Sequence, residues 1–237
     1  MTGAHCGNDT GASPSPLEEA IGGEVTAITA SARHQGRFEV LVSGTSIATL
    51  SLDAIERLRL RTGAVWTTAI ASAAASEEAA LHTFDRAANM LAARPRAARD
   101  LERQLLRKGE PAVHVAAAIA RLATLGAVDD ARFARQFIRS KLAGAGLSRR
   151  RLQSELWRRG VAREVIDAAI AEVMVEDEVD ESAQITEVAA KKLRTLRSLD
   201  PATARRRLYA FLARRGYESA AIRRVMDSLL GGESSIE

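Results

Sequence analysis

The feature that most constrains this chain is a basic segment that ends in glycine and occurs three times. The glycines are Gly109, Gly160 and Gly216, and they lie 51 and 56 residues apart. In each copy, leucine stands eight and four residues before the glycine, and two basic residues immediately precede it. The matching residues are Leu101, Leu105, Arg107 and Lys108; Leu152, Leu156, Arg158 and Arg159; and Leu208, Leu212, Arg214 and Arg215. This regularity indicates tandem copies of one structural unit.

Each copy predicts a helix followed by a second helix. Leucines four residues apart lie on one helical face. Glycine suits the left-handed conformation that closes a helix, and the cations before it complement the helix dipole. Apolar residues then recur 6, 10 and 13 positions past each glycine, and they are Val115, Ile119 and Leu122; Ile166, Ile170 and Val173; and Ile222, Met226 and Leu229. We expect three-helix bundles with the same core geometry.

The chain order predicts five segments. Residues 1–23, rich in Gly, Ser, Thr and Pro, are expected to form a disordered tail. Residues 24–65 alternate like strands and predict a small β-rich cap with two or three strands and a covering helix. Three-helix repeats are expected over residues 78–126, 129–175 and 181–230. The fold class is therefore mostly α, with a small N-terminal β-containing cap.

Local signals sharpen these boundaries. Residues 66–93 predict one long helix or two. In the second repeat, Asp129 and Asp130 are expected as the N-cap and first-turn residues of the first helix rather than as a catalytic pair of carboxylates. Residues 143–146 are expected to form a loop, and Ser148 to cap the middle helix. In the third repeat, helices are expected near residues 181–197, 201–215 and 218–230.

Charge is arranged in blocks along the chain. Residues 94–160 hold 16 Lys and Arg against 6 Asp and Glu, whereas residues 161–183 hold one Arg against eight acids. Residues 184–230 are basic again. Basic blocks around an acidic segment indicate a polyanionic partner or a partner of mixed charge.

Several classes of protein are not supported. The single cysteine, Cys6, gives no disulfide framework, and we see neither a secretory signal nor an apolar run of membrane-spanning length, so a cytoplasmic location is expected. The four histidines are scattered, and Gly144–Gly146 lacks the context of a phosphate loop. We therefore predict no catalytic residue, no metal ligand and no cofactor.

The arginines are harder to explain by stability alone. Arg149, Arg150 and Arg151 fall in the first turn of a predicted helix, where the helix dipole disfavours cations. Arg205 to Arg207 repeat the choice slightly further into their helix. A solvated arginine-rich face and a ridge that contacts phosphates or carboxylates both remain open. For Trp157 we favour packing within the bundle over a role as a surface anchor.

Two segments resemble one known family. Residues 125–138, Leu-Gly-Ala-Val-Asp-Asp-Ala-Arg-Phe-Ala-Arg-Gln-Phe-Ile, and residues 151–161, Arg-Leu-Gln-Ser-Glu-Leu-Trp-Arg-Arg-Gly-Val, are similar to the RecX family of recombination regulators. The tandem Leu-x-x-x-Leu-x-Arg-Lys/Arg-Gly pattern is similar to it too. The resemblance covers roughly residues 80–230 and is looser in the third repeat, where Phe211 stands in place of Glu155.

The resemblance implies a non-enzymatic modulator of RecA whose three repeats form an elongated curved array. Such proteins bind the groove of the RecA–DNA filament and inhibit its ATPase, strand exchange and coprotease functions, which modulates recombination, DNA repair and the SOS response. We expect a monomer that contacts the RecA filament. The expected contact residues are Arg149, Arg150, Arg151, Arg158, Arg159, Arg205, Arg206, Arg207, Arg107 and Lys108.

Two other functions stay open. Three-helix units with basic middle helices resemble helix-turn-helix geometry, so direct binding to single- or double-stranded DNA is the main alternative. A helical scaffold for some other protein would predict no effect on RecA and indifference to DNA.

Overall fold

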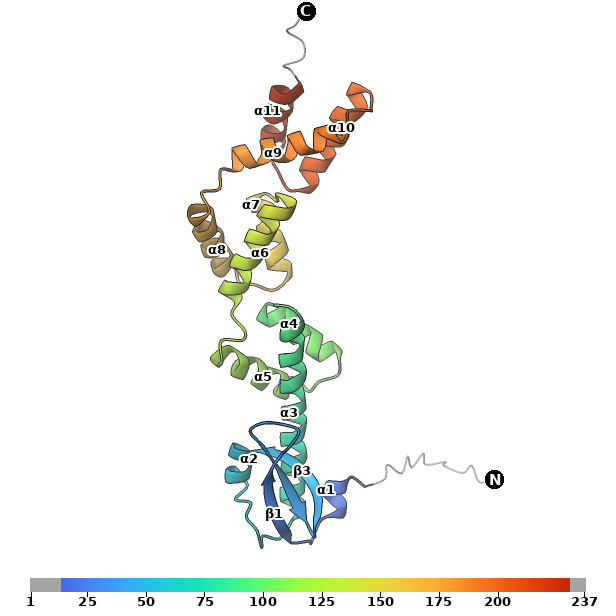
Figure 1. The fold of residues 1–237 in the computed structure, drawn as a ribbon, viewed down its shortest axis with the longest axis vertical. Helices are drawn as coiled ribbons and strands as arrows, with labels where there is room; N and C mark the ends of the chain where they lie inside the picture. Colours follow the sequence, from blue (N-terminus) through green and yellow to red (C-terminus); the bar gives the residue numbers. More distant parts are fainter. Residues whose placement is uncertain (1–13, 231–237) are drawn as a thin grey trace, which may run out of the picture. The chain divides into compact units, whose positions relative to one another are not determined.

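A computed structural model describes residues 14–230 of the chain, and these form two compact units. The first unit comprises the chain up to Arg86 together with Glu110–Ala118. The second comprises Ala87–Gly109 and the chain from Ile119 onward. Most of the described residues are helical, and the strands belong to the first unit (Figure 1). The predicted fold class, mostly α with a small N-terminal β element, is confirmed.

The first unit is built on a three-stranded antiparallel sheet. Strands β1 (Val25–Ala30), β2 (Arg37–Val42) and β3 (Thr45–Ser51) follow one another in the order β1-β2-β3. Helix α2 (Leu52–Arg57) follows β3 directly, and Ser51 caps it through a hydrogen bond from the Ala54 amide. The predicted cap of strands with a following helix is therefore present.

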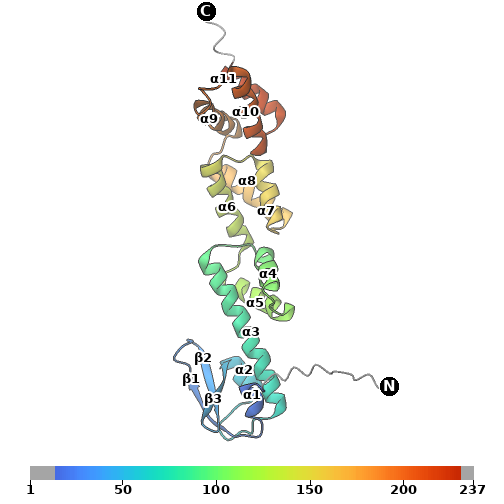
Figure 2. The ribbon, with the colours of Figure 1, turned by 90° about the vertical axis from the view of Figure 1, so that its right-hand side faces the viewer.

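Helix α3 (Thr68–Ala93) is one continuous helix that begins beside the sheet (Figure 2). Its Ala71 and Ala74 are buried in the same apolar cluster as Val40 and Leu50 of the sheet. Trp66, immediately before the helix, is fully buried in that cluster. The first unit therefore has a core of its own.

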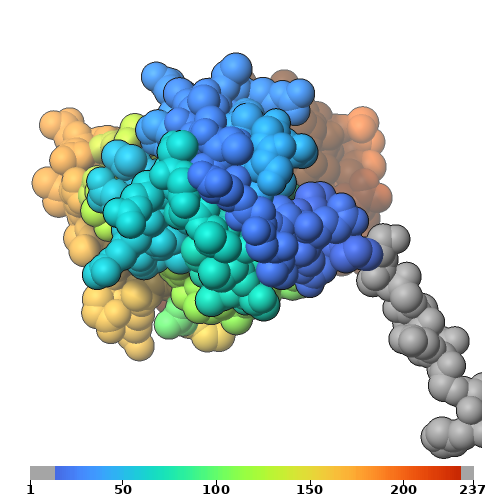
Figure 3. Space-filling view, turned by 90° about the horizontal axis from the view of Figure 1, so that it is seen from below, coloured from blue at the N-terminus to red at the C-terminus, as the bar shows by residue number. Residues whose placement is uncertain are grey.

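The tail predicted over residues 1–23 extends too far. Residues Pro16–Glu19 form a short helix, α1, and Leu17 is buried. The Trp66 indole N–H donates to the Leu17 carbonyl at 3.0 Å, which fixes this segment against the start of α3. In Figure 3 the dark-blue segment that begins at residue 14 lies beside the teal part of the chain where α3 starts. A buried leucine and a tryptophan hydrogen bond outweigh the polar composition that suggested disorder. The first part of the predicted tail, with Cys6, lies outside the described residues.

The repeats consist of short helices in chain order. They are α4 (Ala98–Arg107), α5 (Ala112–Thr124), α6 (Asp130–Ala145), α7 (Arg149–Arg158), α8 (Arg163–Glu176), α9 (Glu181–Arg194), α10 (Pro201–Arg214) and α11 (Ser219–Leu230). The middle helices, α4, α7 and α10, carry the repeated leucines. All six are 0 % exposed, as their spacing predicts; they are Leu101, Leu105, Leu152, Leu156, Leu208 and Leu212.

The second and third repeats each have a distinct core. In the second repeat, Ala134 and Ile138 of α6 pack with Leu152 of α7 and Ile170 of α8. In the third, helices α9, α10 and α11 surround an equivalent cluster. The loop predicted over residues 143–146 is wrong, because α6 continues to Ala145 and only Gly146 leaves it, in the left-handed conformation.

Candidate partner-binding surface

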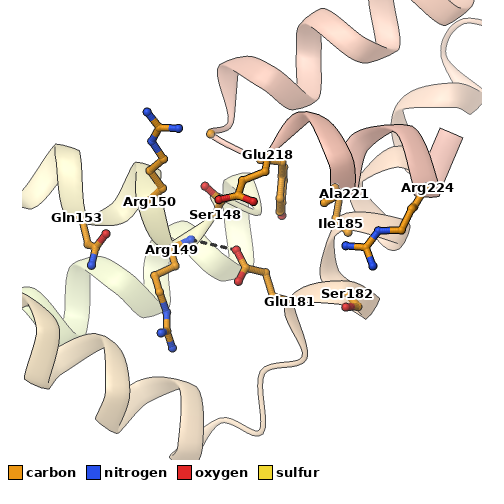
Figure 4. Close-up of a pocket in the computed structure, with 12 residues that line it drawn as sticks. Ser148, Arg149, Arg150, Gln153, Glu181, Ser182, Ile185, Glu218, Ala221 and Arg224 are labelled. Carbon is orange, nitrogen blue, oxygen red and sulfur yellow. Dashed lines mark hydrogen bonds between the residues drawn. The ribbon is translucent and has the colours of Figure 1, made fainter.

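Helix α7 begins with three arginines and has no acid in its own first turn. Ser148 caps it as predicted, because its hydroxyl accepts a hydrogen bond from the Arg151 amide at 3.3 Å. A carboxylate reaches the same end from the next repeat. The Glu181 side chain accepts from the Arg149 amide at 3.4 Å (Figure 4). The charge that the helix dipole favours here is therefore supplied by α9.

The same arrangement closes the start of α4. Its N-cap residue, Ala97, has no side chain that could cap, and the Asp130 carboxylate of α6 accepts from the Ala98 amide at 2.8 Å. Asp129 caps its own helix through the Arg132 amide at 2.9 Å, as predicted. The two adjacent carboxylates thus bind backbone amides at two different helix ends and do not form an acid–base pair.

The glycines that close α7 and α10 make a second contact between repeats. A Cβ placed on Gly160 would lie 2.5 Å from Cβ of Arg99 in α4. A Cβ on Gly216 would lie 2.6 Å from the Ser148 hydroxyl and 2.7 Å from Cβ of Arg151. Each of these two glycines therefore meets the first turn of the preceding repeat's middle helix. The sequence indicated only their role as helix stops.

Residues next to Gly216 complete the junction between the second and third repeats. The Ser148 amide donates to the Arg215 carbonyl at 3.1 Å, and the Tyr217 hydroxyl donates to the Gly146 carbonyl at 2.9 Å. The Arg215 guanidinium donates to the Ala145 carbonyl. Burial raises the pKa of Tyr217 to about 12, and the nearby Glu181 carboxylate acts in the same direction. Arg215 is thus a structural residue as well as part of the basic pattern.

Three of the ten predicted contact residues are paired within the chain. Arg151 and Arg159 both form ion pairs with Glu155, at 3.1 and 3.5 Å, and Arg159 also lies 4.5 Å from the centre of the Phe137 ring. Arg205 pairs with Asp227 at 2.9 Å. These three arginines are held by their own repeats, which makes them less available to a partner.

The other seven side chains are exposed and have no hydrogen bond or ion pair within residues 14–230. They are Arg107, Lys108, Arg149, Arg150, Arg158, Arg206 and Arg207. We name this set the free basic residues. Arg149 and Arg150 border a cleft of about 540 Å³ between the second and third repeats, across from Arg224 of α11, and Glu181 and Glu218 line it as well. Figure 4 shows their side chains leaving α7 in opposite directions, so they do not converge on one small anion.

The interpretation that Trp157 packs in the bundle is wrong, because its side chain is 70 % exposed. It directly follows Leu156, so it points about 100° around the helix from the buried leucine stripe. Leu106 occupies the same position in α4, three residues before the glycine, and is 42 % exposed. The middle helices of the first two repeats thus share an exposed apolar position beside their free basic residues.

Within residues 14–230 there is no cluster of His, Cys, Asp and Glu that could hold a metal ion. In the same range, no helix combines the length and apolar character needed to span a bilayer. His114 is half-buried, with a long 3.5 Å contact from its Nε2 to the Ser76 hydroxyl. Its hydrogen bonds include no titratable partner.

Comparisons with known proteins agree on one family. Family models described as "RecX, second three-helix domain" and "RecX, third three-helix domain" match residues 129–170 and 179–226. "Regulatory protein RecX" of Mycobacterium avium is 39 % identical over 128 residues, covering 54 % of this chain and 73 % of that protein. Its counterpart in Amycolatopsis mediterranei is 36 % identical over 151 residues, covering 62 % and 85 %.

Solved structures show the same fold. A crystal structure of "regulatory protein RecX" superposes with a TM-score of 0.70 at 18 % sequence identity, covering 86 % of this chain and 99 % of that chain. RecX from Lactobacillus salivarius superposes with a TM-score of 0.51 at 14 % identity, covering 64 % and 96 %.

Proposed function

Because the chain belongs to the RecX family of regulatory proteins, we propose that it binds the RecA–DNA filament and inhibits the RecA ATPase, strand exchange and coprotease activities. It would thereby modulate recombination, DNA repair and the SOS response. It would act as a cytoplasmic monomer, without a cofactor and without catalysing a reaction. The observation that supports this most directly, beyond family membership, is the set of free basic residues on α4, α7 and α10.

The pairing of charges within the second repeat supports an external partner. The arginines of α6 are matched by acids of α8: Arg135 pairs with Glu172 at 3.3 Å, and Arg139 with Glu176 and Asp177. Hydrogen bonding to Asp177 raises the pKa of Arg139. The acidic block is thus partly neutralised from inside the repeat, whereas the free basic residues of α7 and α10 have no such acids. Phosphates or carboxylates of a filament would complement them.

The decisive experiment is RecA ATPase on single-stranded DNA with increasing amounts of this protein. We expect inhibition by the parent chain, and inhibition weakened at least about tenfold by the double variant Arg150→Glu/Arg158→Glu, because two attractive charges become repulsive. Arg61→Glu is the matched control, since Arg61 is exposed but lies in the first unit. No inhibition by excess parent protein would refute the function. Equal inhibition by the double variant would refute only the assignment of these arginines.

Direct binding to DNA is the second candidate, and the same free basic residues favour it. Filter binding without RecA separates the two. Tight binding whose logarithm falls steeply with the logarithm of salt concentration would show that phosphates are contacted directly. Binding that appears only when RecA is present would favour recognition of the filament.

A further inference from the structure

We propose that the depression beside Trp157 is a binding site for one unstacked base of single-stranded DNA. The depression has a volume of about 310 Å³ and lies between α7 and α8, lined by Trp157, Gln153, Ser154, Arg163, Ile166 and Asp167. The indole and the Arg163 guanidinium thus border one hollow, and both groups are planar. Bases of single-stranded nucleic acids stack on such aromatic rings and guanidinium planes.

The walls of the depression suit the edge of a base. The Gln153 amide donates to the Asp167 carboxylate at 2.9 Å, and the Arg163 guanidinium lies 3.6 Å from the same carboxylate. The hydrogen bond orients Gln153 and Asp167, whereas the Arg163 side chain is 85 % exposed and its longer contact leaves the guanidinium able to move onto a base. Amide, hydroxyl and carboxylate groups together offer donors and acceptors to a base, whereas Ile166 provides an apolar floor.

A path for the phosphates continues from this depression. Gln153 lines both the depression and the cleft that Arg149, Arg150 and Arg224 border together with Glu181 and Glu218. Arg158, exposed and without an internal partner, is adjacent to Trp157. A strand with one base at Trp157 would therefore pass exposed cations on α7. A neutral partner segment would leave these cations uncompensated. An acidic segment would compensate them but would not use the two planar groups for stacking, so we commit to single-stranded DNA.

Binding of a base at Trp157 is a property of the isolated protein and does not require RecA. The base-binding site and the inhibition of RecA can therefore fail separately. The test is the affinity of the full chain for a fluorescently labelled 20-nucleotide oligothymidylate, measured by anisotropy. Alanine substitution of stacking aromatics costs about 1–3 kcal/mol per base, which is roughly a 5- to 150-fold loss of affinity. We expect Trp157→Ala to show such a loss and Trp157→Phe to retain most of the binding.

Two controls separate base stacking from contact with phosphates. Leu106→Ala changes the equivalent exposed position in the first repeat, where Ala112 stands in place of Arg163, and should leave the affinity unchanged. An abasic 20-mer keeps the phosphates but lacks the bases, and Trp157→Ala should not alter its binding. Because Trp157 is exposed, the thermal melting curve should be the same for parent and variant.

Intrinsic fluorescence gives an independent readout. Of the two tryptophans, Trp66 is fully buried in the first unit and Trp157 is exposed. Saturating oligothymidylate should quench the same component of the tryptophan fluorescence that iodide quenches. Trp157→Phe should abolish this quenching. The site is refuted if Trp157→Ala binds oligothymidylate as well as the parent. It is equally refuted if the substitution weakens only binding to RecA, which would make Trp157 a protein anchor.

Discussion

Replacing Gly160 by alanine tests the contact between the first two middle helices. Gly160 has φ of +86°, and Gly109, at the equivalent position, has φ of +84°. An L-residue in this conformation costs about 1–2 kcal/mol, so both alanine variants carry that cost. Only at Gly160 would the new Cβ meet another helix, 2.5 Å from Cβ of Arg99; at Gly109 it would meet nothing within 4 Å.

The difference between the two variants therefore measures the contact itself. Overpacking of this kind typically costs about 1–3 kcal/mol, because the obstructing atom is fixed to the backbone of α4. We expect a loss of about 1–2 kcal/mol for Gly109→Ala and about 2–5 kcal/mol for Gly160→Ala. Urea unfolding followed by circular dichroism gives both values. Amide hydrogen exchange over residues 97–101 should accelerate only in Gly160→Ala.

A double-mutant cycle provides the internal check. Arg99→Gly removes the Cβ that Gly160→Ala would strike, so the two substitutions together should cost at least about 1 kcal/mol less than their sum. Losses of stability for Gly109→Ala and Gly160→Ala that agree within about 0.5 kcal/mol would show that α4 gives way freely. The close approach would then contribute nothing to the junction.

Three further perturbations address the other contacts. Asp130→Ala should cost about 1 kcal/mol in urea unfolding and speed exchange of the Ala98 amide, since it removes the cap of α4; an unchanged exchange rate would contradict this. The pKa of Tyr217 in the folded protein lies above the value near 10 of an unfolded chain. The contribution of neutral Tyr217 to the free energy of unfolding is therefore complete below pH 10 and is lost as pH rises towards 12, by an amount of order 2 kcal/mol. Tyr217→Phe should lack that loss, and a parallel decline in both proteins would contradict the assignment. Glu155→Gln should cost less than about 1 kcal/mol, because its two partners are partly exposed. The substitution also frees Arg151 and Arg159 to bind phosphates of single-stranded DNA. The slope of log affinity against log salt concentration should then steepen by up to about 0.7 for each phosphate gained, and an unchanged slope would count against this role of Glu155.

Local sequence patterns predicted most of the helices and their cores. Leucines four apart and glycines at helix ends act within one helix, so their signal lies within a dozen residues. The short helix α1 was missed because only Leu17 marks it in a polar segment, and its partner, Trp66, lies 49 residues away. Trp157 was assigned to the core although its place directly after Leu156 pointed it elsewhere.

The contacts between repeats could not be predicted from the pattern of one repeat. Gly160 meets a helix that precedes it by a whole repeat, and nothing near it in sequence indicates this. One signal was available in retrospect: the first helices of the second and third repeats begin with the acidic pairs Asp129-Asp130 and Asp180-Glu181. In each pair the first residue caps its own helix and the second caps an earlier one.

These second acids also bear on how the chain matures on the ribosome. Asp130 and Glu181 each bind an amide 32 residues earlier in the chain. At about 5–20 residues per second, roughly 2–6 s pass between synthesis of the start of a middle helix and synthesis of the acid that completes it. Until then, the first turns of α4 and α7 lack that carboxylate. Translation thus imposes a direction on assembly, in which the first and second repeats are each completed only after the next repeat has begun to emerge.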